Sequence, residues 1–567
     1  MYKIDKAVAV AVAHESEDNQ MSVTRSTTQA RADRSDWRAA TMFLLLIALL
    51  ADANASVDTV WVRTYDGPCH GTDGAQDIVL DPQGNVIVTY WSEKVEDYHD
   101  YVTAKFDSDG QCKWQVTYDG PGDSRSQPFA AGTDDAGNVY VTGASAEGGR
   151  YERDIVTVKY SRSGEERWVA RYSGPGDYWD KPNDMAVDGG GNAYITGWEG
   201  VGQLRQYVTL KYDSTGQCKW VRHFQGSGGW DEAWALGIDS AGSVFVTGSS
   251  CYGSTEWDIV TVKYDNDGNE RWVAHYPGPN PSRCYGTALA VDGQGGVYVA
   301  GRTSPAPVAT AMTVVRYDSS AAVRWVEEYL GPESLGGSVE ALTLDRSGNV
   351  IAAGIASRPR YQDADYATLK LDSLGNVLWV RLWGGVAAGT DRPIGVATDS
   401  LDNVYVTGTS YIGPSPYDRE CATVCYDSAG DEQWVAHFAH EPYWEAAGYV
   451  VAAIGPSHVY VAGFVGESLT LNDGLLIRYT QTPGAIGEQE PTRLSGPPLP
   501  SVVRRTVTLG PNERVELIDI SGRHIMSLVP GCNDLSGMVP GVYLLVEQPT
   551  DEKRFKTPRA LKLVIAR

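Results

Sequence analysis

Hydrophobic positions between residues 57 and 480 fall in short runs that are separated by polar turns. Four successive runs show the pattern: Arg271–Tyr276 (RWVAHY), Ala288–Asp292 (ALAVD), Gly296–Gly301 (GVYVAG) and Met312–Asp318 (MTVVRYD). Each run is rich in β-branched and aromatic residues and is bounded by Gly, Asp, Asn or Ser, which is typical of strands and tight turns. The stretch sustains no helical period, so the pattern predicts an all-β fold.

Tryptophan marks a repeat of this four-run pattern. It recurs at intervals of 52 to 55 residues, and the same three phrases follow it in the same order. The repeated positions are Trp61, Trp114, Trp168, Trp220, Trp272, Trp325, Trp379 and Trp434. Repeats of this length are typical of propellers and solenoids. Four strands in each of eight units predict an eight-bladed β-propeller of four-stranded blades.

Side-chain size predicts the order of the strands within a blade. The strand before the V-Y-V-T-G phrase carries small residues such as Ala130 and Ala288, so we expect it at the crowded hub. The Trp strand is the bulkiest, so we expect it at the rim with its indole between blades. The repeats open with a Trp strand at Val60–Tyr65 and end at Tyr479 without one. We therefore expect Val60–Tyr65 to complete the last blade and to close the ring.

The repeated wording resembles a known family. The phrase VTVKYDxxGxxxWV, followed by YxGPG and VDxxGNVYVTG, is similar to the bacterial SBBP repeat, and Asp154–Tyr172 and Asp258–Tyr276 carry it best. The resemblance covers residues 57–480. It implies a β-propeller with an extracellular or surface role and no settled activity. The family name implies seven blades, which stays an alternative to the eight counted in the chain.

The remaining segments suggest export. Residues 1–55 are predicted to be a leader and signal peptide, because arginines precede the apolar run Met42–Ala51 and Ala53-Asn54-Ala55 follows it as a cleavage site. Cleavage is expected after Ala55. The apolar run is too short to cross a bilayer as a helix, so we expect no integral membrane span in the mature protein.

The C-terminal part differs in composition from the repeats. Residues 481–503 are rich in Pro and Gly and are predicted to be a linker that follows the propeller of residues 56–480. Residues 504–567 resemble the C-terminal sorting domain of the type IX secretion system, a small β-sandwich. The resemblance rests on the D-x-S-G-R turn at Asp519–Arg523, on Pro540–Leu545 and on the closing strand Leu561–Ile565. It implies the type IX machinery as a partner and a secreted or cell-surface location.

Charge and cysteine content narrow the choice of ligand. Lys and Arg number 47 against 72 Asp and Glu, giving a net charge of −25, which argues against nucleic acid as a partner. The 8 cysteines are scattered without a CxxC pair, so neither a disulfide scaffold nor a zinc site is expected. The turns Asp107–Gly110 and Asp265–Gly268 begin like calcium loops but lack the later ligands, so a hairpin turn is the simpler interpretation. We expect no cofactor, with calcium as the open alternative.

A recurring position eight residues before the turn Asp of the hub strand is the candidate site. It should lie near the mouth of the central channel, and aromatic residues flank it in several repeats. Carboxylates beside exposed aromatic rings suit sugars, whose faces stack and whose hydroxyls donate hydrogen bonds. The alternative is that these carboxylates cap the Gly-Pro loops. The candidate binding residues are Asp73, Asp180, Asp231, Asp391, Trp179, Trp230 and Trp444.

The sequence contains no nucleophile elbow, P-loop or HExxH motif. We therefore expect a non-catalytic module that binds an extracellular glycan or protein. The rival hypothesis is a secreted carbohydrate-active enzyme that uses carboxylates at the channel mouth. A structural component of a surface layer is a third possibility.

Overall fold

The computed structural model describes most of residues 56–482 and strands within residues 506–565. The short segments left out between 56 and 482 are 96–97, 122–124, 147–152, 177, 253–255, 280–282, 307–308, 359–363, 386, 388, 414–417, 440–444 and 469–470. The predicted signal peptide with Ala55, most of the predicted linker, and Trp444 lie outside the described residues. Chain contacts divide the protein into two units, Asn54–Gly487 and one that contains Glu488–Arg567, and each is described by itself.

The first unit contains six four-stranded antiparallel sheets, each formed by consecutive strands. The first two comprise β2 (Asp73–Leu80), β3 (Val86–Val95), β4 (Tyr98–Phe106), β5 (Cys112–Tyr118), β6 (Ser126–Thr133), β7 (Val139–Ala146), β8 (Arg153–Tyr160) and β9 (Glu166–Tyr172). The next two comprise β10 (Lys181–Val187), β11 (Ala193–Val201), β12 (Leu204–Tyr212), β13 (Cys218–Phe224), β14 (Asp231–Ile238), β15 (Val244–Tyr252), β16 (Glu256–Tyr264) and β17 (Glu270–Tyr276). The last two comprise β18 (Tyr285–Val291), β19 (Val297–Ala306), β20 (Ala309–Tyr317), β21 (Val323–Tyr329), β22 (Gly337–Leu344), β23 (Val350–Ser357), β24 (Ala364–Leu371) and β25 (Val377–Trp383). The 3-10 turn η1 (Pro332–Ser334) precedes β22.

A larger sheet of eight strands completes the unit. Its two halves meet at a parallel bridge between Arg419 and Glu445. One half comprises β26 (Arg392–Thr398), β27 (Val404–Tyr411), β28 (Arg419–Tyr426) and β29 (Glu432–Phe438). The other comprises β30 (Glu445–Gly455), β31 (His458–Ser468), β32 (Leu471–Thr482) and β1 (Ser56–Tyr65).

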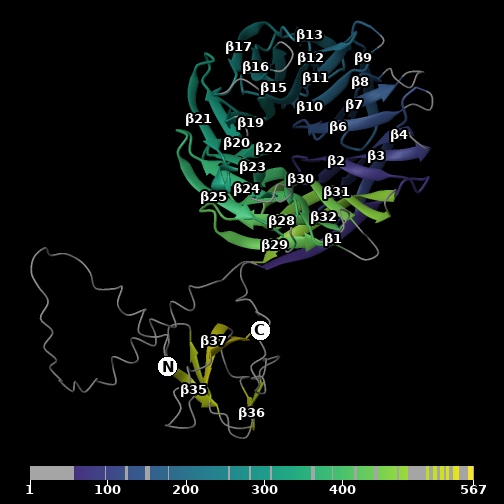
Figure 1. Ribbon diagram of the computed structural model, residues 1–567. Coiled ribbons are helices and arrows are strands. Elements are labelled where there is room, and N and C mark those ends of the chain that lie inside the picture. The colour runs from purple at the N-terminus through teal and green to yellow at the C-terminus, as the bar shows by residue number, and fades with distance from the viewer. Residues whose placement is uncertain are drawn as a thin grey trace, which may run out of the picture. The chain divides into compact units, whose positions relative to one another are not determined.

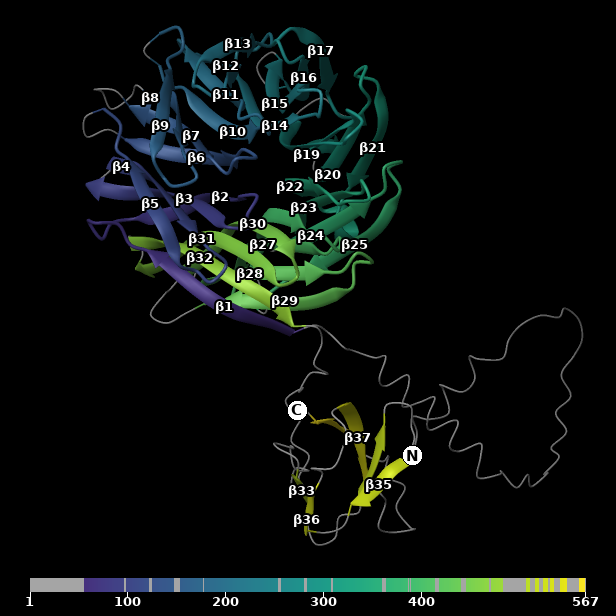
Figure 2. The same cartoon turned by 180° about the vertical axis from the view of Figure 1, so that it is seen from behind.

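The sheets follow one another around a central axis in a propeller arrangement (Figure 1). Their first strands contact one another in the order β2, β6, β10, β14, β18, β22, β26 and β30, and β30 contacts β2 in turn. The same circular order is visible from behind (Figure 2). The first strands therefore form the hub, as their small residues predict, and a hollow of about 410 Å³ lies among their C-terminal ends.

The N-terminal strand completes the last sheet. Strand β1 pairs antiparallel with β32, from Ser56 opposite Thr482 to Tyr65 opposite Gly474. In Figure 1 the purple β1 lies beside the yellow-green β32, although they come from opposite ends of the repeat region. The predicted closure by Val60–Tyr65 is therefore confirmed, and it leaves no unpaired edge on β32.

The rim tryptophans fasten each sheet to the next. Seven of the eight indole N–H groups donate to a backbone carbonyl in the turn between the third and fourth strands of the following sheet, at 3.0 to 3.3 Å. The ring also lies against the turn glycine: a Cβ on Gly216 would come within 2.7 Å of the Trp168 ring. Gly216 has φ +86°, which a side chain disfavours as well. The turn that begins like a calcium loop is thus the docking site of the neighbouring indole.

The recurring lysines bind the same turns. Lys105 lies 2.6 Å from the carboxylate of Asp81 in its own sheet and donates to the carbonyl of Arg162 in the next, which also accepts from Trp114. Lys370 repeats both contacts with Asp345 and Ser428. The lysine therefore links a turn carboxylate of its own sheet to a turn carbonyl of the next sheet.

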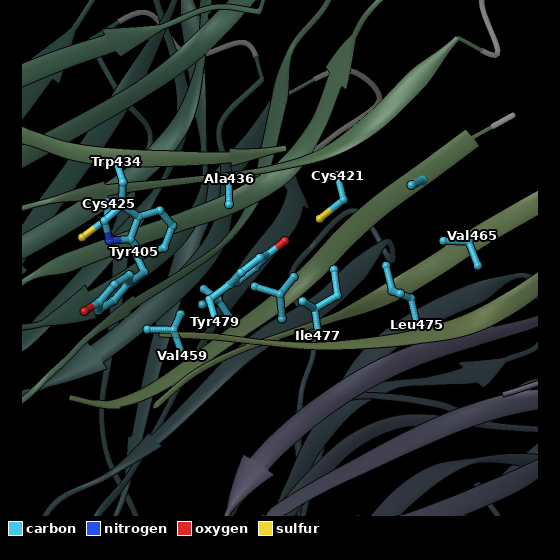
Figure 3. Packing of buried hydrophobic residues seen from close by; sticks show 13 residues of the cluster. Tyr405, Cys421, Cys425, Trp434, Ala436, Val459, Val465, Leu475, Ile477 and Tyr479 are labelled. Carbon is cyan, nitrogen blue, oxygen red and sulfur yellow. The ribbon is translucent and has the colours of Figure 1, made fainter. Parts of the chain in front are cut away.

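The contact pattern is interrupted at one interface. No hairpin turn joins β32 to β1, because the two strands come from opposite ends of the repeat region; their ladder continues from Tyr479 to Thr482. Trp434, in the preceding sheet, faces this interface, and among the described residues its indole N–H has no hydrogen-bond partner. Cys425 occupies the lysine position there and is buried (Figure 3). A lysine at position 425 would find no turn carbonyl to bind. A buried thiol occupies the position instead.

The second unit contains two small sheets. In one, β33 (Thr506–Leu509) pairs with β36 (Gly531–Asp534). In the other, the order is β35 (His524–Leu528), β34 (Val515–Asp519), β37 (Gly541–Glu547) and β38 (Ala560–Ile565). Gly541-Val542-Tyr543 and the closing strand, which carry part of the family resemblance, thus lie on the adjacent strands β37 and β38.

Two observations concern membranes and disulfides. No helix among the described residues combines the length and apolar character needed to cross a bilayer. The seven cysteines of the first unit, all of them among its described residues, are free thiols.

Replacing a rim Trp by Phe tests the docking hydrogen bond. Trp220 and Trp434 are equally buried, but the N–H of Trp220 donates to Asn266 whereas that of Trp434 has no described partner. We expect Trp220→Phe to lower the free energy of unfolding by about 1 kcal/mol more than Trp434→Phe. Chemical denaturation of both variants measures the difference, and equal losses would show that the hydrogen bond contributes nothing.

Deleting Val57–Asp66 tests the closure. The deletion removes the ladder to β32 and exposes an unpaired strand edge, so we expect a lower Tm and concentration-dependent aggregation. A ten-residue deletion within the leader is the matched control and should leave the Tm unchanged. An unchanged Tm after loss of Val57–Asp66 contradicts the role of β1.

Candidate functional site

The four candidate aspartates are buried at the start of the hub strands. Asp73, Asp180, Asp231 and Asp391 are 0 to 2% exposed. Each carboxylate accepts the backbone N–H of a glycine in the loop that leads from the rim strand to the hub strand, at 2.5 to 2.8 Å. The second oxygen accepts from a neighbouring strand, for example from Gly200 for Asp180. These carboxylates fasten glycine-containing loops, which are Gly-Pro loops at Asp73 and Asp180 as the alternative interpretation has it, and their part in binding a ligand stays a prediction.

Asp180 lies next to a second buried acid, Glu199. A Cβ on Gly174 would lie 3.0 Å from an oxygen of each. Burial and the nearby Glu199 raise the pKa of Asp180 to about 7, against hydrogen bonds from Gly174 and Gly200 that lower it. Burial also acts on Glu199, but His223, Tyr172 and Gln206 outweigh it and lower the pKa of Glu199. The pair therefore divides into a carboxyl that holds its proton readily and a carboxylate that stays ionised.

The aromatic candidates are accessible, in contrast to the aspartates. The side chains of Trp179 and Trp230 are 41% and 45% exposed, and each immediately precedes a buried aspartate, Asp180 or Asp231. They belong to the loops before β10 and β14, on what we call the entry face, where the hub strands begin. Trp230 also forms a parallel bridge with Arg205 at the start of β12. Exposed indoles at fixed positions are the part of the predicted site that can contact a ligand.

A ring of β-bulges at the hub was not predicted. In each hub strand one residue is unpaired where the register shifts, which is the mark of a β-bulge. Every bulge residue is at least partly accessible, whereas the residue before it is buried. The bulge residues are Gln76, Phe129, Asn183, Trp234, Thr287, Glu340, Ile394 and Tyr449. They differ in type from sheet to sheet, so the hub entrance is chemically asymmetric although the fold repeats.

Several bulge residues reach the next hub strand. Asn183 donates to the carbonyl of Ala233 at 2.7 Å, and Thr287 donates to that of Val339 at 2.8 Å. Glu340 pairs with Arg392 at 2.9 Å. Trp234, by contrast, is 39% exposed and lies 5.7 Å from the ammonium of Lys181. Trp234 therefore adds an indole to the entry face beside Trp179 and Trp230.

A sequence signal for the bulges exists in the glycine that ends the V-Y-V-T-G phrase. A Cβ on Gly197 or Gly248 would collide with the backbone carbonyl of the residue two places before the bulge. The glycine is needed because the bulge pushes the hub strand toward its neighbour. The recurrence of this glycine in the phrase is therefore a sequence signal that the second strand and the hub strand approach each other closely.

The turn aspartates bind their own backbone. Asp107 accepts the N–H groups of Asp109 and Gln111 at 3.1 and 2.8 Å, which confirms the hairpin-turn interpretation of this motif. Among the described residues, Asp66, Asp73 and Asp473 offer oxygens within 4.8 Å of one another. Asp73 already accepts from Gly67 and Glu93, and Asp66 contacts His70. Calcium therefore stays an untested possibility.

Two further carboxyls, Asp77 and Asp184, connect neighbouring hub strands. Asp77 accepts the N–H of Ala131 and Asp184 that of Leu236, at 2.8 and 2.7 Å. Burial raises the pKa of Asp77 to about 6 and that of Asp184 to about 7. Both hold a proton in the native state at a pH where the unfolded chain has released it.

Because Asp184 holds its proton more tightly in the folded protein than in the unfolded chain, we predict that stability depends on pH. Because burial raises the pKa of Asp184 from 3.8 to about 7, the free energy of unfolding should fall as pH rises from about 4 to about 7. The expected loss is on the order of a few kcal/mol. Asp184→Asn forfeits an acceptor and lowers stability throughout, but it should flatten this slope in thermal unfolding across that range. An unchanged slope contradicts the assignment.

Comparison with known proteins bears on the fold. The family model for SBBP, a β-propeller repeat, matches residues 378–414. This stretch begins within β25, includes β26 and ends just after β27. No curated protein matches the chain.

Solved structures give a weak likeness. Sqt1 from Chaetomium thermophilum has a TM-score of 0.46 and 11% identity, over 75% of this chain and 98% of that one. The β-propeller domain of the Trilobed protease from Pyrococcus furiosus has a TM-score of 0.37 and 10% identity, over 62% and 93%. The polysaccharide lyase Uly1 has a TM-score of 0.38 and 10% identity, over 62% and 90%. Likeness at this level bears on neither ligand nor reaction. Residues 378–414 carry a β-propeller repeat of the SBBP family, which supports the predicted repeat family.

Proposed function

We propose that this chain is an exported eight-bladed β-propeller that binds glycans on its entry face without catalysis. The blade count is supported by the cyclic contacts of the first strands and by the division of the eight-stranded sheet into two four-stranded halves. The rim tryptophans dock one sheet on the next around this ring.

The observation that carries the binding role is the contrast between exposed indoles and buried carboxylates. Trp179 and Trp230 are more than two-fifths exposed, whereas Asp180 and Asp231 beside them are 0% exposed. Aromatic side chains combine large contact area with low conformational entropy, which suits them to recognition surfaces. Stacking against a sugar ring uses that area. A protein ligand is the other class that such a surface can bind.

The rival enzyme hypothesis rests on the same carboxylates. The divergent pKa values of Asp180 and Glu199 resemble the division between a general acid and an ionised partner. A general acid or base, however, needs an oxygen within hydrogen-bond reach of the substrate. The oxygens of Asp180 are buried and already accept from Gly174 and Gly200, which favours binding over hydrolysis.

Export is part of the proposal. The arginine-flanked apolar run and the cleavage site after Ala55 support secretion, and the net charge of −25 suits an extracellular protein that meets no nucleic acid. The two small sheets of the second unit and its P-G-V-Y phrase support a sorting domain for type IX secretion. The protein is then released or held at the outer cell surface.

A glycan array combined with a hydrolysis assay tests the function. We expect the full chain to bind a subset of glycans and to release no reducing ends. Trp179→Ala and Trp230→Ala should each weaken binding about tenfold, because each removes a stacking surface. Leu374→Ala, which truncates a side chain 74% exposed on a rim turn, is the matched control and should bind normally.

The alternatives give different results. Release of reducing ends that is lost in Asp180→Asn or Asp231→Asn establishes the enzyme. Absence of binding to every glycan, with a folded protein, contradicts the proposed function.

A further inference from the structure

We infer that the glycan bound at the entry face is an acidic polysaccharide. The inference rests on the proposed function and names its ligand class. The surface concerned consists of Arg153, Trp179, Lys181, Arg205, Trp230 and Trp234, which we call the aromatic–cationic patch. These residues come from the sheets that begin with β6, β10 and β14.

Cations hold the exposed indoles in place. The guanidinium of Arg205 lies 4.9 Å from the centre of the Trp230 ring and 4.0 Å from that of Trp198, so it contacts two indoles. The guanidinium of Arg153 lies 5.0 Å from the ring of Trp179. The ammonium of Lys181 lies 4.4 Å from the ring of Phe129 and 5.7 Å from that of Trp234. Each exposed indole of the patch therefore has a positive charge beside it.

The positive charges outnumber their counter-charges. Glu232 forms an ion pair with Arg205. Within the described part of the chain, no carboxylate lies at ion-pair distance from Lys181 or Arg153. Burial lowers the pKa of Lys181, Arg205 and Arg153 lower it further, and Glu232 acts in the opposite direction. Three crowded cations with a single ion-paired acid, Glu232, form a locally positive surface next to the buried Asp180 and Glu199, on a protein whose net charge is −25.

An anionic ligand satisfies these charges. A carboxylate or sulfate placed beside Lys181 and Arg205 would form charge-assisted hydrogen bonds, which are about twice as strong as neutral ones. Nucleic acids need an extended basic surface, which a patch of three cations on an acidic protein does not supply. The ligand must therefore combine an anionic group with a face that stacks on an indole. A pyranose ring that carries a carboxylate or a sulfate has both.

The repeat geometry favours a polymer of such rings. Trp179 and Trp230 precede the corresponding aspartates of successive repeats, Asp180 and Asp231, so neighbouring sheets present the same stacking element. A chain of identical sugar units can use both. Trp234, at the bulge of β14, extends the surface toward the hub.

Calorimetry with defined polymers tests the inference. The probes are polygalacturonate fragments, dextran sulfate, neutral dextran and poly-glutamate. We expect the full chain to bind one or both acidic polysaccharides, with an affinity that falls as salt rises, and to bind neutral dextran and poly-glutamate at least tenfold more weakly. The two acidic probes distinguish a carboxylate ligand from a sulfate ligand.

Two variants locate the binding. Lys181→Met keeps the aliphatic stem and removes the charge, so it should weaken binding of the acidic polysaccharide about tenfold or more. Lys113→Met removes the same charge from a rim lysine that is 53% exposed, and it should bind as the unmodified chain does. Trp179→Ala should also weaken binding, and if it fails to fold, Lys181→Met alone decides.

Other outcomes overturn the inference in distinguishable ways. Equal binding of neutral dextran, lost in Trp179→Ala, leaves the glycan function standing and refutes the acidic ligand. Equal binding of poly-glutamate shows that the patch recognises negative charge alone and points to an acidic protein as the ligand. Binding of an acidic polysaccharide that Lys181→Met does not weaken refutes the patch. No binding of any polysaccharide refutes the proposed function itself.

Discussion

The interaction on which the ring depends is a hydrogen bond from an indole N–H to the turn of the next sheet. A four-stranded sheet has two faces to cover, and in this chain each sheet covers its neighbour's. The indole supplies the apolar area and one directional bond, and the turn glycine supplies the space for the ring. Lysine then binds the same carbonyl from the adjacent strand. Because the contact recurs at each turn, the spacing of Trp along the chain reflects the spacing of sheets around the axis.

This constraint gives the two ends of each sheet different roles. The turn that receives the indole is fixed by packing, so its residues vary little from repeat to repeat. The opposite ends of the strands, at the entry face, are free of that demand, and in four of the repeats a buried aspartate fastens the loop there. Side chains there differ from sheet to sheet: Trp230 and Trp234 in one, Glu340 and Arg392 in others. Chemical variety is therefore concentrated where the scaffold tolerates it.

The sequence predicted the repeating fold well, because its signals are local. Trp spacing, the alternation within V-Y-V-T-G and the Asp-x-x-Gly turns each act within one strand or hairpin. The strand that closes the last sheet followed from a count of phrases. The burial of Asp73, Asp180, Asp231 and Asp391 did not follow, because it depends on which way a loop folds over the carboxylate. Lys181, Arg153 and Arg205 were missed because only the folded chain brings them beside tryptophans from other strands.

The interface at Cys425 and Trp434 shows that the repeat sequence differs beside the junction of β32 and β1, which no hairpin turn connects. A cysteine replaces lysine, and an indole lacks its acceptor, in the one sheet whose neighbour has no connecting turn among the described residues. The repeats are therefore not interchangeable, because the one beside this interface has lost both the lysine and the hydrogen bond of the indole. A circular permutant that joins β32 to β1 through an Asp-x-x-Gly turn would give Trp434 the carbonyl it lacks. In such a permutant, lysine rather than cysteine would suit position 425. The sheet that precedes the new termini would then have an indole and a lysine without a turn carbonyl to bind.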